Sequence, residues 1–227
     1  MLDNIQGSSV LLLDVETTGL PKFTASQSRY FHYAENDKYD SARIIQIAWV
    51  YIENFDVTKL KPYINDKSNI TSYYRKPKDF KFDTNEINKI SYKKVKKEGV
   101  LLSHIINNYG LGKAINESQY IIGHNILFDA HILMNELFRI NFTNKLDKLN
   151  SMVTDGKYIC TANMGRDICK IRISEYCNYK MPKLGEMYYF YYRKIPDNLH
   201  DAQYDVILLV NILYAMVKIY QREKNKT

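Results

Sequence analysis

A chain of 227 residues with 45% hydrophobic and 25% charged side chains has an ordinary globular composition, which excludes a disordered or fibrous chain. This length suits one elaborated domain with a substantial core, so we predict a single domain over residues 1–227. A formal net charge of +7 favours an acidic partner such as nucleic acid, although the many lysines and tyrosines could also reflect the base composition of the gene.

The sequence shows no pattern typical of export or of membrane insertion. By inspection, no apolar run approaches the roughly 20 residues of a membrane span. Residues 1–9, MLDNIQGSS, lack the basic and apolar regions of a signal peptide. The spacing of Cys160, Cys169 and Cys177 fits no zinc-binding CxxC pair, and three thiols cannot all pair within one chain. We therefore expect an intracellular protein with free thiols and no membrane partner, in a compartment that the sequence leaves open.

The stretch SSVLLLDVETTGLP, residues 8–21, predicts a buried strand that ends in two acids. Side chains alternate along a strand, so Asp14 and Glu16 share one face while Val15 points to the other. This places two neighbouring carboxylates at the carboxyl end of a strand, where ligands bind in α/β sheets. The Thr-Thr-Gly-Leu-Pro segment predicts a turn whose backbone amides are unpaired and able to contact a ligand.

The next part of the chain predicts a loop, two strands and then helices. A polar and aromatic segment at about 21–42 predicts a long loop insertion. Residues 43–55 and 71–82, rich in β-branched and aromatic side chains, predict two further strands. Helical pieces follow within residues 86–115 and are broken by glycines.

Short strands and longer helices alternate in the second half. Residues 119–125 and 158–166 predict strands, and apolar periodicity predicts helices over 126–140, 183–195 and 200–220. A short charged tail ends the chain. Strands early in the sequence and helices interleaved later predict an α/β fold, a mixed sheet covered by helices.

Four acids each lie at the end of an apolar element: Asp14 and Glu16 on the first strand, and Asp129 and Asp205 on helices. Read singly, each could be a helix cap or a solvated flank. Carboxylate oxygens suit hard cations such as Mg²⁺ or Mn²⁺, and a close cluster of them would repel itself without a metal. Two divalent ions would offset the four charges and could support phosphoryl transfer.

Three blocks resemble the DEDDh 3′-to-5′ exonucleases, a superfamily that includes proofreading epsilon-like and RNase T-like enzymes. The blocks are LDVETTGLP, GHNILFDAHIL and LHDAQYDVILLV, and in family order they span about residues 10–212. The resemblance implies a ribonuclease H-like mixed five-stranded sheet flanked by helices. It also implies metal-dependent hydrolysis of phosphodiester bonds from the 3′ end of nucleic acid, with release of 5′-mononucleotides.

The resemblance further implies a role for each acid in holding two Mg²⁺ (or Mn²⁺) ions. Asp14 would bridge both ions, while Glu16 and Asp205 would hold the ion that activates water. Asp129 would serve the other ion. His200 would be the general base, because an imidazole with a pKa near 6.5 can take a proton near neutrality.

The segment around His200 separates two branches of the superfamily. A sister branch uses a tyrosine at the position that Asp201 occupies here, so the histidine branch fits better. With Asn198 as an N-cap, Asp201 would be the third residue of the last helix and would serve structure. The alternative for His200 itself is a polar residue at a helix start.

The resemblance also implies contacts with the 3′ end of the substrate, from Thr17, Thr18, Gly19, Leu20 and Asn125. The alternatives are that Gly19 ends a strand and that Asn125 and the preceding His124 only orient their neighbours. His131, two positions after Asp129, turns away and is expected to be packed or exposed.

Other candidate contacts come from composition. Aromatic side chains such as Tyr30, Phe31 and Tyr33 could stack on bases, and the lysines within residues 93–97 could guide phosphates. Packing and a solvated helix face are the alternatives.

The first block looks more like that of proofreading and DNA-trimming members, so the resemblance favours DNA over RNA as the substrate. A polymerase or replication partner, a preference for single strands and the oligomeric state stay open. The rival hypothesis is a catalytically silent nucleic-acid- or polymerase-binding module on the same fold. Such a module would be free to lose the carboxylates and His200, which are intact here.

Overall fold

Strands from both halves of the chain form one mixed sheet. The computed structural model describes residues 2–23, 30–56, 58–60, 69–84, 88–173 and 178–224. The strands are β1 (Val10–Thr17), β2 (Ile44–Ile52), β3 (Thr71–Tyr74), β4 (Tyr120–Gly123) and β5 (Tyr158–Cys160). Their order across the sheet is β3-β2-β1-β4-β5, and β1 pairs antiparallel with β2 and parallel with β4. The predicted mixed five-stranded sheet is confirmed.

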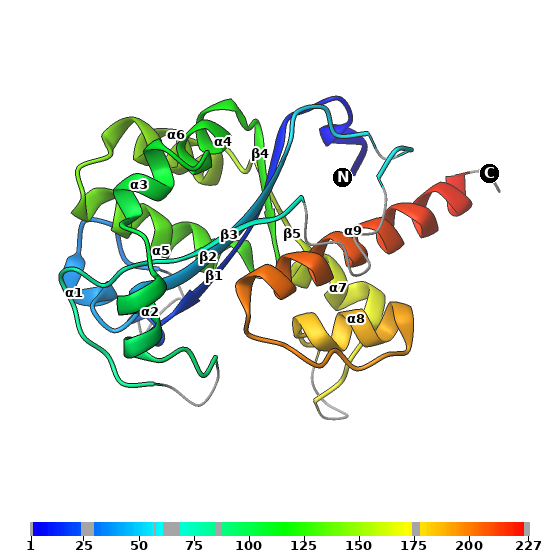
Figure 1. Cartoon of the computed structure of the whole chain (residues 1–227). Coiled ribbons are helices and arrows are strands. Elements are labelled where there is room, and N and C mark those ends of the chain that lie inside the picture. Colours follow the sequence, from blue (N-terminus) through cyan, green and yellow to red (C-terminus); the bar gives the residue numbers. More distant parts are fainter. Residues whose placement is uncertain are drawn as a thin grey trace.

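Helices cover both faces of this sheet, as Figure 1 shows. One face carries α3 (Leu102–Asn107), α4 (Leu111–Glu117), α5 (Ile126–Arg139) and α6 (Thr143–Thr154). The other face carries α7 (Thr161–Cys169), α8 (Leu184–Tyr192) and α9 (Ala202–Lys224). Shorter pieces are η1 (Leu2–Ile5), α1 (Asn36–Tyr39) between β1 and β2, and α2 (Tyr92–Glu98) after β3.

The alternation of β1 divides the core into two layers and fixes where its acids point. Leu11, Leu13 and Val15 pack in the layer that contains α5, whereas Val10 and Leu12 pack in the layer that contains α9. The acids two and four residues after Leu12 therefore face the α9 side. The shared face predicted for them is confirmed, with the intervening valine turned into the core.

Helix α9 is a core helix of this domain. By length and composition its Ala202–Arg222 stretch could cross a membrane, so the expectation that no apolar run approaches that length is wrong. However, 67% of that stretch is buried inside the structure, where the helix packs on β1 and β2. Its predicted apolar face, including Val206 and Leu213, is buried in that layer.

Several predicted boundaries in the sheet are wrong. β5 ends at Cys160, and α7 follows where a strand was expected through residue 166. The Cys160 Sγ accepts a hydrogen bond from the Asn163 amide at 3.5 Å, which caps the new helix. β3 ends at Tyr74, well before the expected residue 82, and the buried Arg75 that follows forms an ion pair with Glu136 at 3.0 Å. No helix was predicted where α6 lies.

The predicted loop insertion and tail differ in part from expectation. The segment at about 21–42 contains α1, whose buried Tyr39 donates a hydrogen bond to the Phe31 carbonyl at 2.6 Å. Residues 24–29 lie outside the described residues. The tail continues α9 through Lys224. Cys160 and Cys169 are free thiols, as expected, and the third cysteine lies outside the described residues.

Candidate active site

The two acids of β1 lie where the strand reaches the edge of the core. The Asp14 Oδ2 atom is buried, and no residue in the described ranges donates a hydrogen bond to it. Glu16 is only 8% exposed. Between Glu16 and Thr17 the register with β2 shifts, and β1 ends at Thr17, one residue after the second acid. Two poorly solvated carboxylates thus stand at the end of β1.

Asp129 joins this pair from α5. It lies in the first turn of the helix, and its Oδ1 accepts a hydrogen bond from the Val15 amide at 2.9 Å. Asn125 precedes the helix with a left-handed backbone, at φ 66°, which aims the first turn at β1. The third predicted acid therefore lies against the backbone between the first two.

Asp205 and His200 reach the same place from the start of α9. The Asp205 Oδ2 accepts a hydrogen bond from the His200 backbone amide at 3.1 Å. Its Oδ1 is buried, with no hydrogen-bond partner among the residues described. Potential ligand atoms of Glu16, His200 and Asp205 all lie within 4.8 Å of one another. The structure thus brings together all five residues expected to do the chemistry.

Burial and mutual repulsion dominate the electrostatics of this cluster. Burial, with repulsion from Asp129, Asp205 and Glu16, raises the pKa of Asp14 well above its usual value. Burial also raises the pKa of Glu16 to about 7, and burial with repulsion from Glu16 raises that of Asp205 to about 8. The pKa of Asp129 is likewise raised, chiefly by burial. A nearby positive charge would therefore be needed for all four carboxylates to be ionised at neutral pH.

Divalent cations fit this donor set. The unpartnered Asp14 Oδ2 and Asp205 Oδ1 are buried acceptors that a hard cation would satisfy. Glu16 and Asp205 lie close enough together to share one ion. The residues that would hold metal are Asp14, Glu16, Asp129 and Asp205.

His200 differs from the acids in being exposed and in a left-handed conformation, at φ 70°. Partial burial and the nearby Lys183 lower its pKa, so its imidazole is neutral at neutral pH.

The predicted start of the last helix is wrong, because Asp201 rather than Asn198 is the N-cap of α9. Its Oδ1 accepts a hydrogen bond from the Tyr204 amide at 3.1 Å, and α9 begins at the next residue. Asp201 therefore serves structure, as expected.

A cavity of about 330 Å³ opens beside His200. It is lined by polar side chains and one leucine: Asn88, Lys89, Asp197, Asn198, Leu199, His200, Asp201 and Tyr204.

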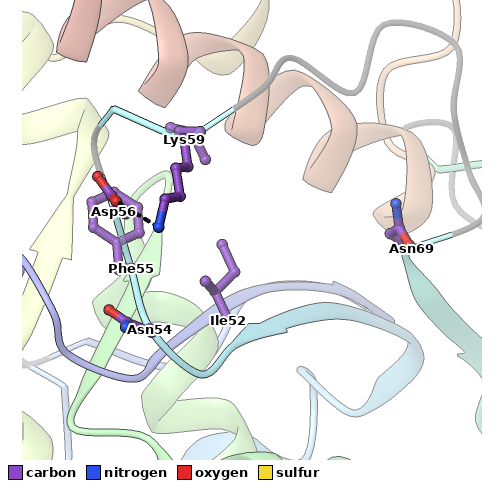
Figure 2. Close-up of a pocket in the computed structure, with 7 residues that line it drawn as sticks. Ile52, Asn54, Phe55, Asp56, Lys59 and Asn69 are labelled. Atoms are coloured by element: carbon purple, nitrogen blue, oxygen red, sulfur yellow. Dashed lines mark ion pairs between the residues drawn. The ribbon is translucent and has the colours of Figure 1, made fainter.

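A second cavity, of about 300 Å³, lies at the C-terminal end of β2, where Ile52 pairs with Val10 (Figure 2). Its acid, Asp56, forms an ion pair with Lys59 at 3.4 Å and accepts hydrogen bonds from Thr58. The carboxylate in the second cavity is therefore already paired and hydrogen-bonded, whereas Asp14 and Asp205 each keep a buried oxygen without a donor among the described residues.

The turn after the acids is built tightly and ends in an exposed leucine. The Thr18 amide donates to the Arg43 carbonyl at 2.9 Å, so the expectation that the amides here are unpaired is wrong for Thr18. A Cβ on Gly19 would lie 2.9 Å from the Ser41 carbonyl oxygen, which explains the glycine. Thr17 Oγ1 donates to the Gly19 carbonyl at 2.7 Å. Leu20 is 68% exposed, an unusual state for a large apolar side chain.

The remaining candidate substrate contacts, His124 and Asn125, lie just before α5. The ring nitrogens of His124 contact Thr161 Oγ1 at 3.0 Å and the Pro182 carbonyl at 2.8 Å, so this side chain orients its neighbours. Asn125 hydrogen-bonds to Tyr30 through its side chain. The Tyr30 ring stacks on His131, which is packed as expected, with the ring centroids 4.5 Å apart.

The sequence did not single out Asn88, which the structure places beside Glu16. Its side chain hydrogen-bonds to the Glu16 carboxylate and donates to the Thr17 carbonyl at 3.0 Å. Asn88 lies in a polar segment without periodicity or motif, so no local signal could have identified it. Only the folding of this connection against the end of β1 reveals the contact.

Comparison of the sequence with protein families gives one match that covers most of the chain. Residues 11–213 match the family RNase_T, described as exonuclease. A search of curated protein sequences gave no match. The family match includes every residue of the acidic cluster.

Solved structures with the same fold share little sequence with this chain. S. pombe Pop2p, in a form bound to Mg²⁺ and Mn²⁺, has a TM-score of 0.60 and 18% identity, over 96% of this chain and 86% of that protein. E. coli ExoI in a zinc-bound complex with single-stranded DNA has a TM-score of 0.57 and 17% identity, over 95% of this chain. This chain spans 43% of the length of that ExoI chain.

A third structure, of yeast CAF1 co-crystallised with the NOT1 MIF4G domain, has a TM-score of 0.57 and 15% identity, over 95% of this chain and 81% of that one. These likenesses confirm the ribonuclease H-like fold. The family match, which covers most of the chain, shows that it belongs to the RNase_T exonuclease family, within the DEDD superfamily.

Proposed function

We propose that this protein is a metal-dependent 3′-to-5′ exonuclease of the histidine branch, releasing 5′-mononucleotides and favouring DNA over RNA. The observation that carries the proposal is the meeting of three buried acids, half-buried Asp14 and His200, with two buried acid oxygens lacking donors among the described residues. Membership of an exonuclease family supports the nuclease class. The direction, the branch and the substrate are the proposed part.

In this proposal Asp14, Glu16, Asp129 and Asp205 hold two Mg²⁺ or Mn²⁺ ions. When bound, such ions supply an activated water and stabilise the leaving oxygen of a phosphodiester. The carboxylates themselves orient the site through fixed contacts. Asp129 is fixed by the Val15 amide, and Asp205 by the His200 amide.

His200 acts as the general base. Its lowered pKa leaves the imidazole neutral at neutral pH, ready to take the proton of the attacking water. As the water oxygen bonds to phosphorus, the bond to the 3′ oxygen of the preceding nucleotide breaks. That oxygen takes a proton and becomes the new 3′ hydroxyl, while the released nucleotide keeps its 5′ phosphate.

The substrate end is held by the turn after β1 and by the start of α5. Exposed Leu20 packs on the terminal base, while the Thr17–Thr18–Gly19 backbone and Asn125 contact the terminal nucleotide. The Thr18 amide has no part in this, since it is bonded to Arg43. Backbone and stacking contacts of this kind need no sequence readout.

Nucleic acid with a free 3′ end is the proposed substrate, and a protein partner is a further proposal. The ExoI relative was solved with single-stranded DNA, and CAF1 with a domain of NOT1, which supports both ideas by analogy. A polymerase or replication protein is the partner that we propose here.

The test is digestion of a 5′-labelled single-stranded oligonucleotide in Mn²⁺. We expect a ladder of products that shorten one nucleotide at a time, and a block by a 3′-terminal phosphorothioate. Asp14→Ala and EDTA should each abolish the ladder. No shortening, or shortening that survives Asp14→Ala and EDTA, would defeat the proposal and favour a silent binding module. Matched DNA and RNA oligonucleotides then test the preference for DNA.

A further inference from the structure

We propose that Asn88 is a positioning residue that orients the Glu16 carboxylate for metal binding. This inference rests on the proposed function, in which Glu16 is a metal ligand. Asn88 lies 72 residues after Glu16 in sequence and belongs to the connection between β3 and α2, which no part of the family resemblance had marked.

The side-chain amide of Asn88 has its two ends fixed. The Oδ1 accepts a hydrogen bond from the Ile90 amide at 3.2 Å, so the amino group points the other way. That amino group donates to the Thr17 carbonyl at 3.0 Å, and the Asn88 side chain also hydrogen-bonds to the Glu16 carboxylate. One amide thus ties together the acid and the residue that follows it on β1.

Described residues of the β3–α2 connection make fixed contacts elsewhere in the fold. Near its start, Arg75 and Asp79 join the buried charge network around Glu136. Near its end, Ile90 is 5% exposed and packs in a small core with Ile45 and Val95. The backbone directly after Asn88 is therefore anchored in the core.

The orientation of the Glu16 carboxylate depends on contacts within the protein. It is 8% exposed, so water is largely excluded from orienting its carboxylate. A donor on a ligating carboxylate fixes its rotamer, and loss of such partners typically weakens metal binding about 10- to 100-fold. Asn88 supplies this donor while leaving the other oxygen positions of Glu16 for a cation.

Asn88 also lines the cavity beside His200, together with Asn198 from the loop before α9. Asn198 belongs to the same cavity, yet no hydrogen bond from its side chain to Glu16 occurs among the described residues. It is an exposed asparagine of the same size, which makes Asn198→Ala the matched control.

The experiment measures the dissociation constant for Mn²⁺ without substrate, by electron paramagnetic resonance of the free ion, and the thermal midpoint in EDTA. Asn88→Ala removes the side-chain amide, and Asn88→Leu removes the donor while keeping a similar volume. We expect both to weaken Mn²⁺ binding about 10- to 100-fold with a thermal midpoint close to that of the unchanged protein. Asn198→Ala should bind Mn²⁺ normally.

The proposal is overturned if either Asn88 variant binds Mn²⁺ with full affinity, or if Asn198→Ala weakens binding equally. It is also overturned if both Asn88 variants unfold in EDTA, because the residue would then hold the fold rather than the ligand. An unchanged protein that binds Mn²⁺ without degrading nucleic acid would defeat the proposed function and leave the assignment of Asn88 standing. Active Asn88 variants with normal Mn²⁺ affinity would defeat the assignment alone.

Discussion

Helix α5 contributes one buried acid to each of two charge clusters. In one cluster the acid is paired with arginines, and in the other it lies among further acids. Glu136 accepts hydrogen bonds from Arg43 at 2.9 Å and from the Ile44 amide at 3.2 Å, and it pairs with Arg75 at 3.0 Å. Asp129, seven residues earlier, joins acids whose remaining buried oxygens lack donors in the part of the chain described here. Glu136 is neutralised by arginines of the protein itself, although the buried Arg75 Nε has no acceptor among the described residues, whereas the second cluster leaves buried acid oxygens that a cation would satisfy.

The largest expected effect is on catalysis, from Asp14→Asn. This change removes one buried charge from the acidic cluster and should lower the rate of hydrolysis by about three orders of magnitude or more, since two-ion chemistry depends on the ligand set. The thermal midpoint in EDTA should stay the same or rise, because like charges repel there. Initial rates on a 5′-labelled oligonucleotide, with melting curves in EDTA, check both. A variant that is inactive because it melts early would contradict the comparison.

The cluster around Glu136 should show the opposite behaviour. Glu136→Gln leaves the buried Arg43 and Arg75 with only the exposed Asp79 as a shared anion and should cost about 3–5 kcal/mol of unfolding free energy, measured by urea denaturation. The control is Glu117→Gln, whose pair with Lys113 is exposed and 3.9 Å long. That loss should be under about 1 kcal/mol. Equal losses in the two variants would show that the buried network is not stabilising.

His200 tests whether the residue beside the acids is a base or a ligand. As a base, His200→Ala should lower kcat about 100-fold or more while the dissociation constant for Mn²⁺ stays unchanged. As a third ligand with Glu16 and Asp205, its loss would weaken Mn²⁺ binding as well. Single-turnover rates at saturating Mn²⁺ and equilibrium binding of the ion separate the two roles.

The smallest effect is a dependence of stability on pH in EDTA. Glu16 and Asp205 have pKa values raised to about 7 and about 8, so the folded state holds their protons more tightly than the unfolded state does. Stability should therefore fall as pH rises from about 4.5 to about 8, and the thermal midpoint should fall with it. Mn²⁺ should reverse the fall at pH 8. A flat profile in EDTA would contradict the raised pKa values.

Much of this architecture was readable from the sequence because its signals are local. The alternation in β1 fixed the shared face of Asp14 and Glu16, and the apolar stripe of α9 placed Asp205 at its start. The strand boundary at Cys160 was missed because capping by a cysteine sulfur has no strong sequence pattern.

Contacts between distant segments could not be predicted. Asn88 reaches Glu16 only because the β3–α2 connection folds back against the end of β1. The Thr18 amide, expected to be available, is bonded to Arg43 across the turn. Both outcomes depend on tertiary packing, which neither periodicity nor motif spacing encodes.

The most direct test is an anomalous difference map from a crystal of this protein soaked in Mn²⁺. We expect Mn²⁺ peaks within bonding distance of Asp14, with Glu16 and Asp205 coordinating one of them. Peaks only elsewhere, or a fully occupied hydrogen-bond network around Asp14 with no peak at high Mn²⁺ concentration, would contradict the claim that these acids form a cation site.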